Sequence, residues 1–157
     1  YDNYQKAFEF DIFYSQTDQL LFLTTTTPTA KKFLKELEKI DTLNINYTSL
    51  KFDLMAISNM MPQTKGVSFN STDAGVSSKW FSGDEVDVND EVIEALANDE
   101  ATKIIGTLDI LGKSRTIMLT QSGTILSFTS LTDISEQKEY PMLEFSIATL
   151  MKIGVLS

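Results

Sequence analysis

Three β-prone runs near the end of the chain, separated by two tight turns, most constrain the fold. The runs cover residues 102–111, 114–120 and 124–129, and they are rich in the β-branched and bulky side chains that sheets favour. Only Gly112-Lys113 and Gln121-Ser122-Gly123 separate them. Turns this short cannot carry a crossover connection, so neighbouring strands must be antiparallel. The sequence therefore predicts a three-stranded antiparallel meander.

The N-terminal region predicts a hairpin. Apolar residues alternate with polar ones over 8–14, a second β-prone run covers 20–25, and the polar segment 15–19 lies between them. A similar alternation of Leu43, Ile45 and Tyr47 with asparagines predicts a further strand at 43–47. Short β-like pieces at 67–69 and 79–81 flank a polar loop.

Four segments carry helical patterns. Thr27-Pro28 opens an amphipathic helix that extends to about Ile40. The apolar residues of 49–61 fit both the spacing of a helix and the alternation of a strand, and we favour a helix capped by Ser49. Further helices are expected at 90–98 and at 141–153. The prediction is an α+β fold in one domain, 1–157, with a mainly antiparallel sheet (N-terminal hairpin and C-terminal three-strand meander) packed by about three to four helices.

The acidic stretch, residues 84–100, is the strongest functional signal. It reads DEVDVNDEVIEALANDE, with eight carboxylates and no Lys or Arg, in a chain of net charge -9. Carboxylates gathered on one face speed the encounter with a basic partner. The alternative is a solvated loop followed by a well-capped helix. The candidate partner-binding residues are Trp80, Phe81, Asp84, Glu85, Asp87, Asp90, Glu91 and Glu94.

Two apolar features allow two interpretations each. Trp80, the single tryptophan, is either an interface anchor or a plug at the edge of the core, and we favour the core. The segment Pro141 to Ile153 is apolar around most of its circumference. It belongs either to the core or to a homodimer interface, so a homo-oligomer is one expected assembly.

Composition excludes most catalytic chemistry. The chain has no histidine and no cysteine, which removes Ser-His-Asp hydrolysis, thiolate nucleophiles and cysteine-held zinc. We expect no catalytic residues, no cofactor and no metal, and we favour a non-enzyme over an enzyme. Asp84, Glu85 and Asp87 lack the glycine and distal glutamate of an EF-hand loop. Asp109, Lys113 and Arg115 match no nuclease signature, and we expect a surface hairpin with cross-strand charge pairs there.

The remaining expectations concern partners and location. No apolar run is long enough to span a membrane, and the net charge would repel phosphates, so neither a membrane nor a nucleic acid is an expected partner. A cysteine-free chain fits the cytoplasm, and this composition is common in bacterial and phage proteins. The predicted function is a non-enzymatic protein-interaction or regulatory module that docks a basic partner through an acidic surface. The alternative is a small-ligand-binding or weakly catalytic (metal/carboxylate) domain with a pocket between sheet and helix.

Overall fold

The computed structural model describes residues 7–157. The chain divides into two compact units, Tyr1–Tyr47 and Thr48–Ser157. The predicted single domain over 1–157 stays a prediction.

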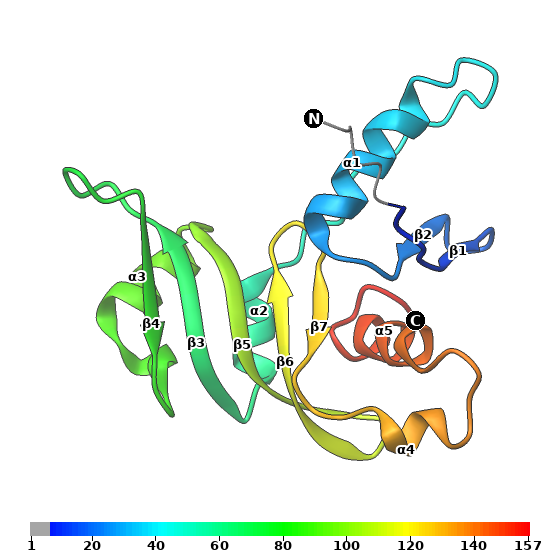
Figure 1. Cartoon of the computed structure of the whole chain (residues 1–157). Coiled ribbons are helices and arrows are strands. Elements are labelled where there is room, and N and C mark those ends of the chain that lie inside the picture. Colours follow the sequence, from blue (N-terminus) through cyan, green and yellow to red (C-terminus); the bar gives the residue numbers. More distant parts are fainter. Residues whose placement is uncertain (1–6) are drawn as a thin grey trace, which may run out of the picture. The chain divides into compact units, whose positions relative to one another are not determined.

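The N-terminal unit contains the predicted hairpin and helix. Strands β1 (Ile12–Ser15) and β2 (Leu20–Leu23) pair antiparallel (Figure 1). Helix α1 (Thr27–Glu38) begins after Thr26 and carries its proline in the first turn, where a missing amide proton costs nothing. The rings of Phe10 and Phe33 meet edge to face with their centroids 5.4 Å apart. These two aromatic side chains join the segment before the hairpin to the helix.

The strand expected at 43–47 is absent, so that prediction is wrong. Residues 44–53 form neither helix nor strand, and Asn44 has a left-handed φ of 45°. A left-handed residue breaks the extended course that a strand requires. The alternation of Leu43, Ile45 and Tyr47 is therefore not matched by any pairing strand.

The C-terminal unit is built on a five-stranded antiparallel sheet in the order β4-β3-β5-β6-β7 (Figure 1). Strands β5 (Ala101–Ile110), β6 (Lys113–Thr120) and β7 (Ile125–Ser127) are the predicted meander. Leu111 and Gly112 form the first turn, with φ values of 54° and 73°. Strands β3 (Gln63–Asn70) and β4 (Ser78–Ser82) extend the sheet on its other side. With its helices, this sheet confirms the α+β class.

Helices α2 (Leu54–Met60), α3 (Asp90–Ala97), α4 (Thr132–Ser135) and α5 (Pro141–Lys152) complete the unit, with a short 3-10 turn η1 at Val86–Val88. Helix α2 is shorter than expected, and its cap is Asp53, whose carboxylate accepts from the Ala56 amide at 3.0 Å. The residues before it form neither helix nor strand, and among them the Phe52 amide donates to the Gln121 carbonyl at 2.9 Å. In the ambiguous segment 49–61 the helix therefore begins only at Leu54, and the predicted cap at Ser49 is wrong. The sequence patterns did not predict helix α4.

The core lies against one face of this sheet. Helices α2, α3 and α5 contact β3 or β5 (Figure 1). The sheet contributes fully buried Val67, Ile104, Leu108, Ile117 and Leu119. Burying each such side chain stabilises the fold by about 1.5–3 kcal/mol.

Helix α5 contributes a narrower stripe to the core than its composition indicates. Phe145, Thr149 and Leu150 are buried, whereas Met142 is 36% exposed and Met151 is 53% exposed. The core interpretation is confirmed for the buried stripe. Whether another copy of the chain covers the exposed methionines stays a prediction.

Candidate acidic docking site

The acidic stretch follows strand β4 and leads into helix α3. The Gly83 amide donates to the Lys65 carbonyl at 3.0 Å and closes the sheet pairing. Val86 in η1 is buried and anchors the loop. Asn89 then caps α3, because its side-chain oxygen accepts from the amides of Glu91 at 3.0 Å and Val92 at 3.3 Å. The helix expected at 90–98 is confirmed, and its first-turn carboxylates lie at the positive end of the helix dipole.

Helix α3 has one buried face and one exposed face. Val92, Ala95 and Leu96 are buried. The intervening positions, which include Asp90, Glu91 and Glu94, are exposed. Asp84 and Glu85 are also exposed, and Asp87 is half-buried. We define the acidic surface as Asp84, Glu85, Asp87, Asp90, Glu91 and Glu94.

Two carboxylates of the acidic stretch have basic partners that the sequence did not indicate. Lys79 on β4 bridges Glu91 and Asp73, the latter at 2.8 Å. The hydrogen bonds to Asp73 and Glu91 raise the pKa of Lys79 above its usual value. Asp99 pairs with Lys51, and the hydrogen bond from Lys51 lowers the pKa of Asp99.

The other carboxylates of the stretch make no ion pair with any residue in the described part of the chain. Their negative charge is therefore not neutralised by an ion pair with any described Lys or Arg. These six residues are Asp84, Glu85, Asp87, Asp90, Glu94 and Glu100.

A small hollow lies between the β3–β4 loop and α3. It has a volume of about 160 Å³, and its charged lining consists of Asp73, Lys79, Glu91, Glu94 and Glu100. Four carboxylates and one ammonium give the hollow a formal charge of 1 - 4 = -3. The hollow is therefore suited to a cationic group.

The two aromatic candidates on β4 point to opposite faces of the sheet, because adjacent strand residues alternate. Phe81 lies on the α3 side, where its ring stacks on Phe69 with centroids 5.5 Å apart and planes 9° apart. Trp80 lies across Gly66, with the Lys103 ammonium 4.8 Å from its ring centroid. The side chain of Trp80 is 47% exposed, so the favoured core position is wrong. Of the two rings, only Phe81 lies on the side of the acidic surface.

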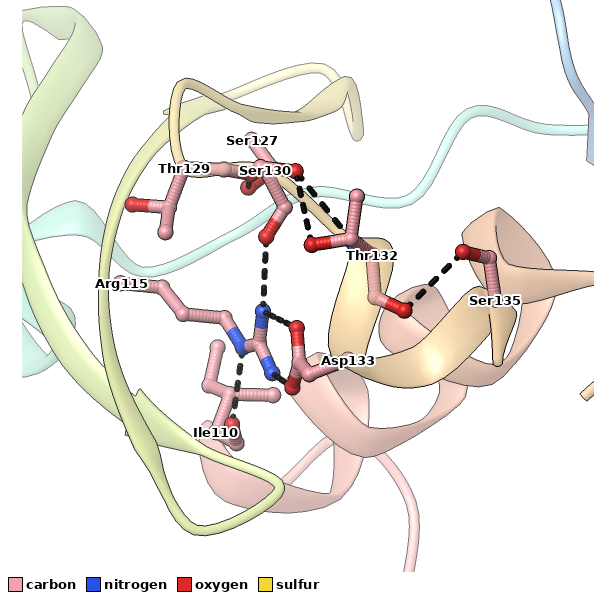
Figure 2. Close-up of polar contacts among 8 residues, drawn as sticks. All are labelled: Ile110, Arg115, Ser127, Thr129, Ser130, Thr132, Asp133 and Ser135. Carbon is pink, nitrogen blue, oxygen red and sulfur yellow. Dashed lines mark hydrogen bonds and ion pairs between the residues drawn. The ribbon is translucent and has the colours of Figure 1, made fainter. Parts of the chain in front are cut away.

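The single arginine is a structural residue. Arg115 is fully buried, and Figure 2 shows its guanidinium between the β5–β6 hairpin and α4. Its Nε donates to the Ile110 carbonyl at 2.9 Å, and its two terminal nitrogens donate to both carboxylate oxygens of Asp133. A longer bond of 3.4 Å reaches the Ser130 carbonyl. The hydrogen bond and the charge of Arg115 lower the pKa of Asp133.

This placement corrects the expectation for the hairpin. Cross-strand surface pairing is wrong for Arg115, because its partner lies in α4 and its side chain is inside. Asp109 is exposed opposite Ser114, and Lys113 lies opposite Ile110. These charged residues therefore do not form a joint site.

The described part of the chain contains neither a metal-binding cluster nor a helix that could span a membrane. Within residues 7–157, no group of three or more carboxylates is arranged to hold a metal ion, and Asp84, Glu85 and Asp87 do not form such a set. No helix in the same range is long and apolar enough to cross a membrane. Comparison of the chain with protein-family models, with curated proteins and with solved structures found no match.

Proposed function

We propose that this protein is a non-enzymatic interaction or regulatory module that docks a basic partner through the acidic surface. The observation that carries the proposal is the group of exposed carboxylates that no described Lys or Arg pairs. A protein that folds stably with such a concentration of negative charge gains free energy when a cationic surface approaches it.

The size of the hollow supports docking over small-molecule binding. Ligand pockets usually measure about 300–1,000 Å³, whereas this hollow measures about 160 Å³. A space of that size suits one lysine or arginine side chain from a larger partner. The second candidate function, binding of a small cationic ligand, is supported by the position of the hollow between sheet and helix.

The test is a titration with a fluorescently labelled oligolysine peptide at low and high salt. Exposed charges are screened over about 10 Å at 0.1 M salt and about 3 Å at 1 M, so we expect affinity to fall steeply with salt. The test variant replaces Asp84, Glu85, Asp90 and Glu94 by Asn or Gln. It leaves Glu91 in place, because that residue holds Lys79.

The matched control neutralises the same number of exposed carboxylates in the N-terminal unit, at Glu9, Asp11, Glu38 and Asp41. Loss of binding in the test variant alone supports docking at the acidic surface. Equal weakening in both variants means that only net charge matters, and unchanged binding in the test variant refutes the proposal. Saturable binding of spermidine, with no binding of oligolysine, would favour the small-ligand function.

A further inference from the structure

Strand β4 forms one edge of the five-stranded sheet. Within residues 7–157 its only neighbour is β3, and the other edge strand, β7, is on the far side of the sheet (Figure 1). Hydrogen bonds from the Gly83 amide to the Lys65 carbonyl at 3.0 Å, and from the Ser71 amide to the Ser77 carbonyl at 3.1 Å, fix which residues pair. Antiparallel pairing alternates, so the backbone of Lys79 and Phe81 points towards β3.

The same alternation directs the other backbone groups of β4 outward. The N–H and C=O groups of Ser78, Trp80 and Ser82 point away from the sheet, and all three residues are exposed. Such a row of backbone groups is a template for an added strand. Proteins recognise extended peptides in this way, with backbone bonds giving affinity and alternate side chains giving specificity.

The charges near β4 indicate which kind of strand would pair with this edge. Asp84 and Glu85 follow the strand directly, and Asp73 and Glu91 both pair with Lys79, the only basic residue in β4. A second copy of the chain would place one acidic edge against another, in a protein of net charge -9. Like charges placed together across an interface are unfavourable. A basic segment is favoured for the opposite reason.

We propose that the basic partner binds as an added β-strand on β4. The side chains of this added strand alternate between the two faces of the sheet. Basic residues lie on the α3 side near Asp73 and Glu91, and apolar residues lie on the other side beside the exposed indole of Trp80. This inference rests on the proposed docking function and specifies the conformation and sequence pattern of the partner.

Trp80 makes the inference directly measurable, because it is the only tryptophan in the chain. The probe is an alternating lysine–valine peptide long enough to cover β4, titrated into the full chain while the emission of Trp80 is recorded. We expect a saturable blue shift as the added strand covers the indole. The control peptides are an alternating glutamate–valine peptide and the lysine–valine peptide N-methylated at its internal amides, which keeps the charge but cannot donate backbone hydrogen bonds.

The expected result is binding of the unmodified basic peptide, with N-methylation weakening it about tenfold or more, since several net hydrogen bonds are lost. On the protein, Ser82→Pro removes an outward-facing amide without removing a bond to β3, and Ser82→Ala keeps that amide. The proline variant should bind weakly and the alanine variant normally. Circular dichroism checks that both variants are folded. If the proline variant is unfolded, the N-methylated peptide alone tests whether the partner binds as an added strand.

Two outcomes overturn the inference and separate it from the docking function. If the N-methylated peptide binds as tightly as its parent, the added strand is wrong. Docking by charge then still stands, provided that neutralising the acidic surface abolishes binding. If neither lysine–valine peptide binds but oligolysine does, the added strand is wrong and docking by charge stands. If none of the three peptides binds, both proposals fail.

Discussion

Replacing Arg115 by Met should destabilise the C-terminal unit substantially. Methionine retains most of the aliphatic stem, so the packing of the side chain inside the sheet is largely kept. The guanidinium and its hydrogen bonds to Ile110, Ser130 and Asp133 are lost. The change therefore isolates the polar contribution of a fully buried arginine (Figure 2).

The magnitude follows from how exposed each partner is. The carbonyl of buried Ile110 loses its donor, which costs about 1–3 kcal/mol for an unsatisfied buried acceptor. The longer bond to the exposed Ser130 adds about 0.5–1.5 kcal/mol. The Asp133 side chain is 39% exposed, so water replaces the lost contact there. The expected loss is about 2–4 kcal/mol.

Thermal unfolding followed by circular dichroism measures this loss. The C-terminal unit has 157 - 47 = 110 residues, for which about 1 kcal/mol corresponds to roughly 4 °C, so the melting temperature should fall by about 8–16 °C. The control is Lys113→Met, which removes the same charge from an exposed position in the same hairpin and should shift melting by no more than about 2 °C. An Arg115→Met protein that melts within that margin of its parent would refute the assignment of Arg115 as a structural tie.

Three further outcomes are expected. Phe145→Ala should destabilise the protein by about 3–5 kcal/mol because the side chain is fully buried, whereas Met151→Ala, at a position that is 53% exposed, should cost far less; urea unfolding of both variants measures the contrast. Asp133 has a lowered pKa in the folded protein, so its contribution to stability is complete above the unfolded value of 3.8 and is lost as the pH falls through the folded value. Asp133→Asn should therefore melt below the parent at neutral pH and converge with it in acid, and parallel melting curves at every pH would contradict this. Gly66→Ala would place a Cβ in collision with the Trp80 ring, so the indole must move and its emission should shift to the red; an unchanged emission spectrum would be evidence that Trp80 does not lie across Gly66.

Short sequence patterns predicted the elements whose formation depends on residues close together in the chain. The meander followed from two short turns, because a turn acts within a few residues, and α3 was expected close to its observed bounds. The strand predicted at 43–47 did not form, because alternating apolar and polar residues permit a strand but do not supply a neighbouring strand to pair with. Strand β3 was seen only in part, since its first half contains Gln, Thr, Lys and Gly and looks like a loop.

The candidate site was less predictable, because two carboxylates of the acidic stretch pair with lysines outside it. Lys51 reaches Asp99 across 48 positions, and no local pattern indicates that contact. Strand alternation places Trp80 and Phe81 on opposite faces, but it does not say which face the helices cover. The burial of Arg115 depends on acceptors from the hairpin, a loop and α4, so only the folded structure shows that its charge is satisfied.

The bridge from Lys79 to Asp73 and Glu91 gives the hollow a resident competitor. An ammonium tethered to β4 has a far higher effective concentration beside these carboxylates than a free amine in solution. A single monovalent cation therefore gains little by displacing it. A multiply charged chain, held at neighbouring positions, can meet the same carboxylates cooperatively. If the hollow is part of the proposed docking site, the resident ammonium of Lys79 should favour ligands that carry several positive charges on one backbone over dilute monovalent ions.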